Sequence, residues 1–468
     1  MEARTLEFVS TAQQALGNRD LQEALGKIKG GWVAGRARAA GRLPEFEALR
    51  DLAAAIKDHS LAHLDLYLEA FEASVVERGG QVHWARDAAE ARAIVLELCQ
   101  AAQARTVTKS KSMLTEEIAL NDFLEANDIE PVETDLGEYI LQLAHQPPSH
   151  LIAPVVHMTQ SEIADVFERR LGGPRLEEAA EIVAAARALL RERYLEADVG
   201  VTGANFLVAE TGSVITVTNE GNAELTQGVP GTHIVLASLE KVVPTMEDAF
   251  TLLRVLARSA TGQEFSCYTT VMTGPRRAAD LDGPAGFHVV LLDNGRSRML
   301  GNEFREMLRC IRCGACMNHC PVYLVTGGHA YGWVYPGPMG SVLTPQLVGI
   351  EQGWPLPNAS TFCGRCEEVC PVRIPLPKLM RHWREEQFKR ELTPPTARRG
   401  LALWAWLARR PRLYRLVTGL AVRLLARLGR QGSLKRLPLA GGWTVSRDLP
   451  APQGRTFMSQ WRSGKDRR

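Results

Sequence analysis

Seven of the nine cysteines in this 468-residue chain fall into two short, regularly spaced runs. The first run has the pattern C-x2-C-x2-C-x3-C-P and comprises Cys310, Cys313, Cys316 and Cys320. The second has the pattern C-x2-C-x3-C-P and comprises Cys363, Cys366 and Cys370. With the first spacing, three thiolates bind one [4Fe–4S] cluster, and the fourth, just before proline, binds a second cluster. The two runs therefore predict a site for two iron-sulfur clusters.

The same rule predicts two sets of ligands, each drawn from both runs. The first set is Cys310, Cys313, Cys316 and Cys370, and the second is Cys320, Cys363 and Cys366. The second set lacks one thiolate, because Ser360 stands where a cysteine would complete the run. The second cluster could therefore be a [3Fe–4S] cluster. It could also be a [4Fe–4S] cluster whose last iron binds Ser360, water or a partner's side chain, although thiolate is the softer and preferred ligand.

Other uses of these cysteines fit the spacing less well. Zinc ribbons pair two C-x2-C motifs and have no need of four cysteines ending in proline. Disulfides form in oxidising compartments. The residues after Met1 are acidic and polar, so we expect no signal peptide and a cytoplasmic location. Cys99 and Cys267 are isolated, and we interpret Cys99 as a small buried apolar residue and Cys267 as a residue without a metal partner.

The chain before the cysteines alternates short apolar strands with helices, which is typical of a mostly parallel α/β sheet. Helical spacing of apolar residues reaches Gly79. Helices are then expected at 87–102, 112–127, 161–169, 176–196 and, beside the first cysteine run, 302–309. Strands are expected at 81–84, 106–108, 130–134, 150–156, 204–209, 213–218, 232–236 and 288–292.

Four regions are expected along the chain. They are an N-terminal helical segment (1–70), an α/β domain (71–300), a helical cysteine domain (301–390) and a basic helical C-terminal region (391–468). The 42 residues between Cys320 and Cys363 are too many for a compact two-hairpin ferredoxin, so a mainly helical module is expected. Between the two runs, aromatic residues in 327–340 either shield a cluster from solvent or pack a small core.

The C-terminal region is strongly basic although the whole chain has a net charge of only +2. From Arg398 onward it holds 17 Lys or Arg and two Asp, so the rest of the chain is net acidic. Residues 401–430 form a candidate amphipathic helix whose arginines argue against a transmembrane span. Such a helix can lie on the inner face of a membrane, but we favour docking onto this chain or a partner subunit. No nucleic-acid-binding motif accompanies the charge.

Several further stretches resemble the lactate utilization protein B family. They are residues 109–118, 133–140, 148–150, 209–213, 219–222, 240–244 and 328–333. The resemblance extends from about residue 61 into the C-terminal region, and the cysteine spacings agree with it.

This resemblance implies a function and a fold. Proteins of that family are iron-sulfur subunits of a three-protein complex that oxidises L-lactate to pyruvate. An α/β LUD-type domain, similar to sugar-phosphate isomerases and coenzyme A transferases, would precede a helical ferredoxin. The seven cysteines would bind two [4Fe–4S] clusters, and the partners would be the other subunits of the lactate-utilization complex and an electron acceptor that the sequence does not identify.

The α/β domain carries a second candidate site. Lys109 and Lys111 follow one expected strand, and Glu210 and Gly212 follow another, where open parallel sheets bind ligands. These groups could hold a carboxylate or a phosphate, or they could be turn and surface residues of a docking domain. We expect an electron-transfer subunit, with an organic-acid-binding redox enzyme or a scaffold for partner subunits as alternatives.

Overall fold

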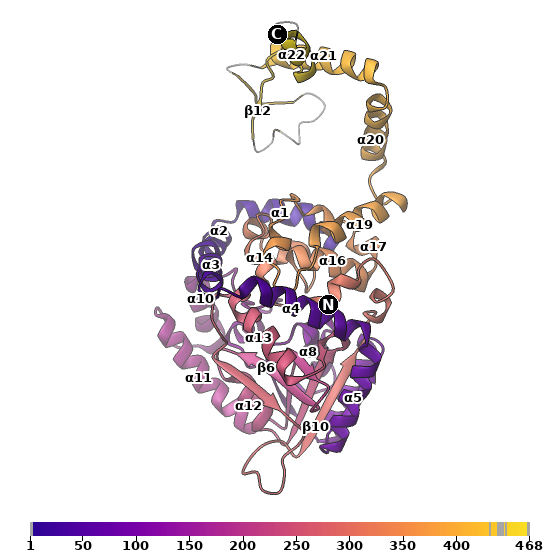
Figure 1. The fold of residues 1–468 in the computed structure, drawn as a ribbon. Helices are drawn as coiled ribbons and strands as arrows, with labels where there is room; N and C mark the ends of the chain where they lie inside the picture. Colours follow the sequence, from indigo (N-terminus) through magenta and orange to yellow (C-terminus); the bar gives the residue numbers. More distant parts are fainter. Residues whose placement is uncertain (1–2, 430–431, 438–443, 445–446, 466–468) are drawn as a thin grey trace. The chain divides into compact units, whose positions relative to one another are not determined.

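The computed structural model describes residues 3–429, 432–437, 444 and 447–465. The chain divides into two compact units, Met1–Lys389 and Arg390–Arg468. The first unit contains the six-stranded and the four-stranded sheet (Figure 1) and, in its sequence, both cysteine runs. Three of the four expected regions pack together within this one unit. The boundaries between those three regions stay predictions.

A six-stranded parallel sheet forms the centre of the first unit, in the order β1-β10-β7-β4-β2-β3. Its strands are β1 (Gln81–Ala85), β2 (Thr106–Lys109), β3 (Glu130–Glu133), β4 (Val199–Thr202), β7 (Thr232–Ser238) and β10 (Gly286–Leu292). Crossover helices bury both faces of such a sheet, which explains its nearly continuous Val, Ile and Leu content. The expected parallel α/β fold is confirmed.

Successive residues of the central strands enter different cores. Ile234 and Leu236 of β7 face the core formed with α6 (Ala88–Ala101), α7 (Met113–Glu117) and α8 (Leu120–Glu125), where Cys99 is fully buried as expected. Val235 and Ala237 face the opposite core with α5 (Leu64–Glu77). This alternation follows from the two-residue period of a strand.

A smaller sheet packs on the α5 side of the large one. Its order is β8-β5-β6-β9, with β5 (Phe206–Val208), β6 (Ser213–Thr218), β8 (Val242–Val243) and β9 (Tyr268–Met272). The remaining helices of this part are α9 (Leu136–Ala144), α10 (Gln160–Leu171), α11 (Ala179–Glu196), α12 (Asn222–Gly228) and α13 (Met246–Ala260).

Two sequence-based expectations about elements are wrong. Residues 150–156 form turns, not a strand. Their apolar character serves burial against the cysteine domain, where His150 Nε2 lies 2.9 Å from Asn318 Oδ1 and the Tyr323 hydroxyl donates to the Ser149 carbonyl at 2.8 Å. The expected helix 112–127 is two helices, because Ala119 between them adopts a left-handed conformation with φ of 51°.

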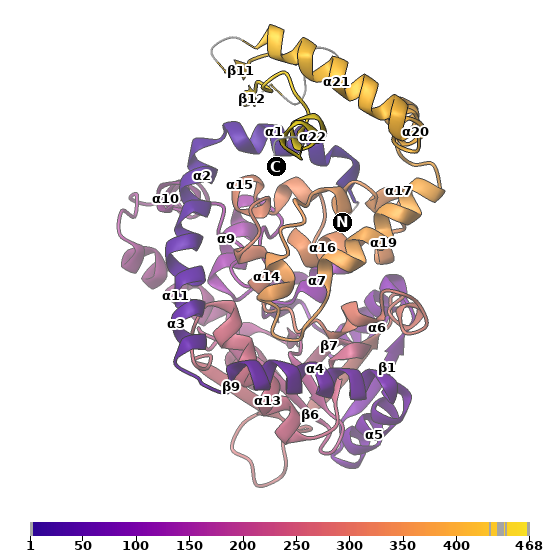
Figure 2. The same ribbon diagram turned by 45° about the horizontal axis from the view of Figure 1, so that its top comes forward.

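The cysteine domain is mainly helical, as expected. It contains η5 (Arg305–Arg309), α14 (Ala315–Asn318), α15 (Tyr323–Thr326), α16 (Gly337–Val348), α17 (Ile350–Gly353), α18 (Arg365–Glu368) and α19 (Leu376–Lys389). The N-terminal helices α1 (Phe8–Gly17), α2 (Arg19–Ile28) and α3 (Ala34–Gly41) run along it, and α4 (Phe46–Ala62) contacts both it and α13 (Figure 2). The N-terminal segment therefore supports the cysteine loops.

The second unit contains α20 (Pro395–Ala408), α21 (Pro411–Leu428), β11 (Ser433–Leu434), β12 (Leu449–Pro450) and α22 (Phe457–Lys465). The expected helix 401–430 is thus divided at Pro411, and its last residue, Arg430, lies outside the described residues. Trp404, Trp406 and Leu420 are exposed in these helices. A search of the described residues finds no helix with the length and apolar content needed to cross a membrane.

Candidate iron-sulfur centre

The two cysteine runs adopt the same backbone conformation. The residue before the second cysteine position has a positive φ in both runs, 59° at Arg312 and 53° at Phe362. The glycine after it is also left-handed, with φ of 72° at Gly314 and 80° at Gly364, and a one-turn helix follows in each case. Ser360 therefore corresponds in sequence to Cys310, and the backbone after each position turns in the same way.

The structure brings one cysteine of the second run to three of the first. Cys310, Cys313, Cys316 and Cys370 line a single small cavity together with apolar residues such as Leu151 and Ile374. This is the composition of the first predicted ligand set. Burial raises the pKa of the Cys370 thiol to about 11, so iron, not solvent, would have to stabilise its thiolate form.

The second set lies closer to solvent. Burial raises the pKa of the Cys366 thiol to about 12, and neighbouring Cys320 and Cys363 add to that rise, which places the three side chains within electrostatic reach of one another. Cys363 is exposed, whereas Cys320 and Cys366 are buried. Ser360 Oγ accepts a hydrogen bond from the Phe362 amide at 3.2 Å. An electron carrier could approach this set from outside.

Backbone amides point at the cysteine sulfurs. The Ile374 amide donates to Cys370 Sγ at 3.4 Å. At Cys320, burial raises the thiol pKa, but the amides of Tyr323 and Val322 oppose that rise by hydrogen bonding to the sulfur. Such donors stabilise thiolates and raise the reduction potential of a bound cluster.

A buried hydroxyl lies between the two sets. Tyr331 is fully buried, and its hydroxyl has no hydrogen-bond partner among the described residues. Burial raises its pKa, and the sulfurs of Cys320, Cys316 and Cys366 raise it further, so cysteines of both sets are close by. A buried O–H donor without a protein partner among the described residues fits a site that holds cluster sulfides.

Within the described residues, no three of His, Cys, Asp or Glu converge closely enough to hold one metal ion. Clusters make a different demand, because each thiolate binds a separate iron atom of the cubane. The burial of five of the seven cysteines, the amide donors and the Tyr331 hydroxyl together fit two clusters. Ligation of iron by the seven cysteines stays a prediction.

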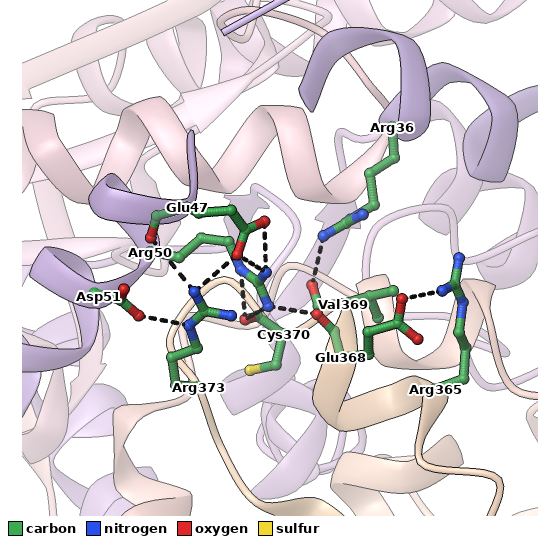
Figure 3. A network of polar contacts seen from close by, with 9 residues as sticks. All are labelled: Arg36, Glu47, Arg50, Asp51, Arg365, Glu368, Val369, Cys370 and Arg373. Carbon is green, nitrogen blue, oxygen red and sulfur yellow. Dashed lines mark hydrogen bonds and ion pairs between the residues drawn. The ribbon is translucent and has the colours of Figure 1, made fainter. Parts of the chain in front are cut away.

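Helix α4 holds the loop that carries Cys370. The Arg50 side chain is 3% exposed, and its Nη2 donates to the Cys370 carbonyl at 2.8 Å and to the Glu368 carbonyl (Figure 3). Arg36 of α3 donates to the Val369 carbonyl at 3.1 Å. On the outside, Arg373 pairs with Glu47 and Asp51, each at 2.8 Å (Figure 3). Two arginines thus donate to three successive carbonyls of the loop, those of Glu368, Val369 and Cys370.

A buried ion network joins the other cysteine loop to the α/β domain. Arg296 pairs with Glu117 at 2.6 Å and with Glu240 at 3.3 Å, and Arg312, next to Cys313, pairs with Glu240 at 3.2 Å. Burial would raise the pKa of Glu240, but Arg296, Arg312 and Lys241 lower it to about 2. The Arg312 guanidinium also lies 5.1 Å from the centre of the Tyr335 ring. The charges compensate one another, as buried ions require.

The predicted ligand residues of the α/β domain do not form one site. Lys109 is fully buried and pairs with Glu133 at 2.7 Å and Glu116 at 3.1 Å. Glu210 accepts a hydrogen bond from the Met246 amide at the start of α13. A Cβ at Gly212 would lie 2.6 Å from the Val75 backbone nitrogen, so this glycine permits packing against α5.

Of the predicted residues, only Lys111 lines the cavity at the carboxyl edge of the sheet, which has a volume of about 240 Å³. Asn222, Lys241 and Arg312 also line it, and sequence reasoning missed all three as ligand residues. Lys241 closely follows β7, so its position after a strand could have identified it. Asn222 and Arg312 depend on long-range packing.

Family models match most of the chain from residue 68 onward. The LUD domain matches residues 68–292, the 4Fe-4S dicluster domain residues 306–374, and Lactate utilisation protein B, C-terminal, residues 379–465. The second match is to an iron-sulfur domain, as predicted for the cysteine region, and the third falls on the predicted C-terminal region.

Similar proteins cover nearly the full length. Lactate utilization protein B of Bacillus pumilus is 45% identical over 425 residues, which make up 90% of each chain. The Geobacillus kaustophilus protein of the same name is 44% identical and covers 94% of each chain. "Uncharacterized electron transport protein YkgF" of Escherichia coli is 41% identical over 97% of this chain and 96% of its own. These relatives confirm the resemblance that the sequence motifs indicated.

Proposed function

The chain belongs to the lactate utilization protein B family, and on that premise we propose that it is the iron-sulfur electron-transfer subunit of a complex that oxidises L-lactate to pyruvate. The names of its relatives refer to lactate utilization and, in one case, to electron transport. The other subunits of the complex are its proposed partners. Bound clusters would each supply one-electron transfer.

The observation that carries this proposal is the meeting of the two cysteine runs. Cys310 and Cys370, which are far apart in the chain, line one cavity. Cys316 of the first set and Cys320 and Cys366 of the second all raise the pKa of the Tyr331 hydroxyl. Two clusters held this way would be neighbours. Because Cys363 is exposed, electrons would enter or leave the chain at the second set.

Ser360 decides the nature of the second cluster in this proposal. It holds the position in the second run that Cys310 holds in the first, and its hydroxyl already accepts a hydrogen bond from the Phe362 amide. Either Ser360 or an outside ligand completes a [4Fe–4S] cluster, or the position leaves a [3Fe–4S] cluster. Iron content distinguishes these arrangements directly.

Replacing Cys316 tests the electron-transfer role. Cys316→Ala should remove the first cluster and abolish lactate-dependent electron flow in the assembled complex, while the α/β domain stays folded. Cys267→Ala is the matched control, since Cys267 is an exposed cysteine outside both sets. Circular dichroism, iron content and lactate-dependent dye reduction report the three properties. Full iron content and full turnover in Cys316→Ala would contradict the proposed electron-transfer role of the first cysteine set.

We also propose that the C-terminal unit docks onto a partner subunit. Its helices expose large apolar side chains beside many arginines, including Leu416, Leu420 and Leu424 along one face of α21. Deleting residues 390–468 should release the chain from its partners in co-purification while its iron content is unchanged. Co-purification of the truncated chain with its partners would reject docking through this unit, and loss of membrane association alone would point to a lipid surface.

A further inference from the structure

The cavity at the carboxyl edge of the six-stranded sheet lies between the α/β and cysteine domains. Its walls come from the residues after β2, β4 and β7, including Ser110, Gly203 and Lys241. Arg312 and Tyr335 of the cysteine domain also line it. Its volume of about 240 Å³ is ample for a small organic acid, and parallel sheets bind ligands at this edge.

Two polar side chains in its wall make no direct hydrogen bond or ion pair among the described residues. Asn222 is 4% exposed, and neither its amide nitrogen nor its amide oxygen has a hydrogen-bond partner among the described residues. Lys241 forms no direct side-chain hydrogen bond or ion pair within the part of the chain that the structure describes, and it interacts with the Glu240 carboxylate only at longer range. Unpaired buried polar groups are costly unless a ligand or water satisfies them.

The other charges of the cavity are already engaged. Lys111 lies 3.7 Å from Asp135 and donates to the Ile152 carbonyl at 2.9 Å. Arg312 is paired with Glu240, as described above. Glu220 accepts a hydrogen bond from the Leu136 amide at 3.0 Å. Lys241 therefore supplies a positive charge that interacts with Glu240 only at a distance, without a direct ion pair among the described residues, and Asn222 offers both a donor and an acceptor.

We propose that this cavity binds a small 2-hydroxy or 2-oxo carboxylate, with the carboxylate on Lys241 and the hydroxyl or oxo group on Asn222. A carboxylate complements a free ammonium group. A primary amide can donate to an oxo group or exchange two hydrogen bonds with a hydroxyl. The choice of this acid class rests on the proposed function in lactate oxidation, whereas the anion site itself rests on the cavity.

A ligand in the cavity would change the electrostatic environment of the first cysteine set. Arg312 lines the cavity, and in the sequence it lies between Cys310 and Cys313. Its guanidinium is fixed by Glu240 and by the ring of Tyr335. An anion next to it would therefore alter the electrostatic environment of the sulfurs in that loop.

The test uses the full-length, cluster-replete protein without partners and without oxygen. Calorimetric titration with pyruvate and with L-lactate should detect binding of at least one acid. Lys241→Met should weaken it about tenfold or more, the effect of losing a charge-assisted hydrogen bond. Lys27→Met removes the same charge from the exposed face of α2 and should bind like the unmodified chain. Asn222→Ala should also weaken binding, and Lys241→Arg should retain most of it.

A second readout is the EPR spectrum of the reduced protein, which should change when the binding acid is added and should change less in Lys241→Met. If Lys241→Met lost its iron, Asn222→Ala would provide the comparison. The inference is overturned if neither acid gives heat, if Asn222→Ala and Lys241→Met bind as tightly as the unmodified chain, or if acetate and inorganic phosphate bind equally well. Absence of binding together with loss of lactate-dependent electron flow in Cys316→Ala would leave the proposed function standing.

Discussion

At the scale of single residues, metal-ligand sets can be predicted where sequence spacing alone defines them. The cysteine sets follow from sequence intervals, and the structure brings Cys370 to the first run as those intervals require. Lys109 was predicted as a ligand residue because it follows a strand. It is instead fully buried with Glu116 and Glu133, because the carboxylates that reach it come from elements that sequence patterns do not place together.

The carboxylates around Lys109 lead to a prediction about pH. Glu138 is buried, neither of its oxygens has a partner among the described residues, and burial together with Glu133 raises its pKa well above the usual value. A raised native pKa means that stability is full below the unfolded pKa of about 4.3 and falls as the pH rises through the raised value. Glu138→Gln should therefore keep or increase the thermal midpoint at pH 8 and flatten its decline with pH.

Lys109→Met is the contrasting variant. It leaves Glu133 and Glu116 buried without their cation, which should destabilise the fold by about 3–5 kcal/mol. Thermal denaturation of the anaerobic protein at pH 5 and pH 8 compares the two variants. A loss of stability in Glu138→Gln equal to that in Lys109→Met would show that Glu138 is ionised and needed in the native protein.

At the scale of elements, period and composition predicted most strands of the parallel sheet, because buried strands have an unbroken apolar signature. They failed at 150–156, whose apolar residues pack on the cysteine domain, and at the left-handed Ala119. Tertiary context, not local preference, determines both. The role of α4 was also invisible, because Arg50 and the carbonyl that it binds on Cys370 are 320 residues apart.

Arg50 of α4 should control how firmly the Cys370 loop is held. Arg50→Met removes the hydrogen bonds from the Arg50 guanidinium to the carbonyls of Glu368 and Cys370, and among the described residues only the Cys370 carbonyl keeps a backbone donor, the Arg373 amide. Each lost hydrogen bond to a charged group is worth about 1.5–3 kcal/mol. We expect iron to be lost to a chelator at least about tenfold faster, the equivalent of 1.4 kcal/mol. The decay of visible absorbance measures this rate.

Arg373→Met provides the matched control. Arg373 reaches the same helix through Glu47 and Asp51, but the three side chains are 34%, 65% and 69% exposed. Exposed ion pairs contribute about 0–1 kcal/mol, so this variant should lose iron at nearly the original rate. Equal rates of iron loss in the two variants would show that the Arg50 hydrogen bonds from α4 do not help to retain the cluster.

At the scale of the whole molecule, the N-terminal helices, the α/β domain and the cysteine domain form one unit, although composition suggested separate regions along the chain. The buried network of Arg296, Glu240 and Arg312 connects the sheet edge to the first cysteine loop. Such contacts join distant segments and leave no periodic trace in the sequence. They place a candidate anion cavity beside a candidate electron carrier in one chain.

The central claim is that this unit holds two neighbouring clusters. Iron and acid-labile sulfide content, measured with EPR spectra before and after dithionite on anaerobically purified protein, tests it most directly. We predict about eight irons per chain and interacting reduced signals if a fourth ligand completes the second cluster. About seven irons and a signal in the oxidised state would indicate a [3Fe–4S] second cluster and no ligand at Ser360. Four or fewer irons, or stoichiometric zinc, in fully folded protein would contradict the account.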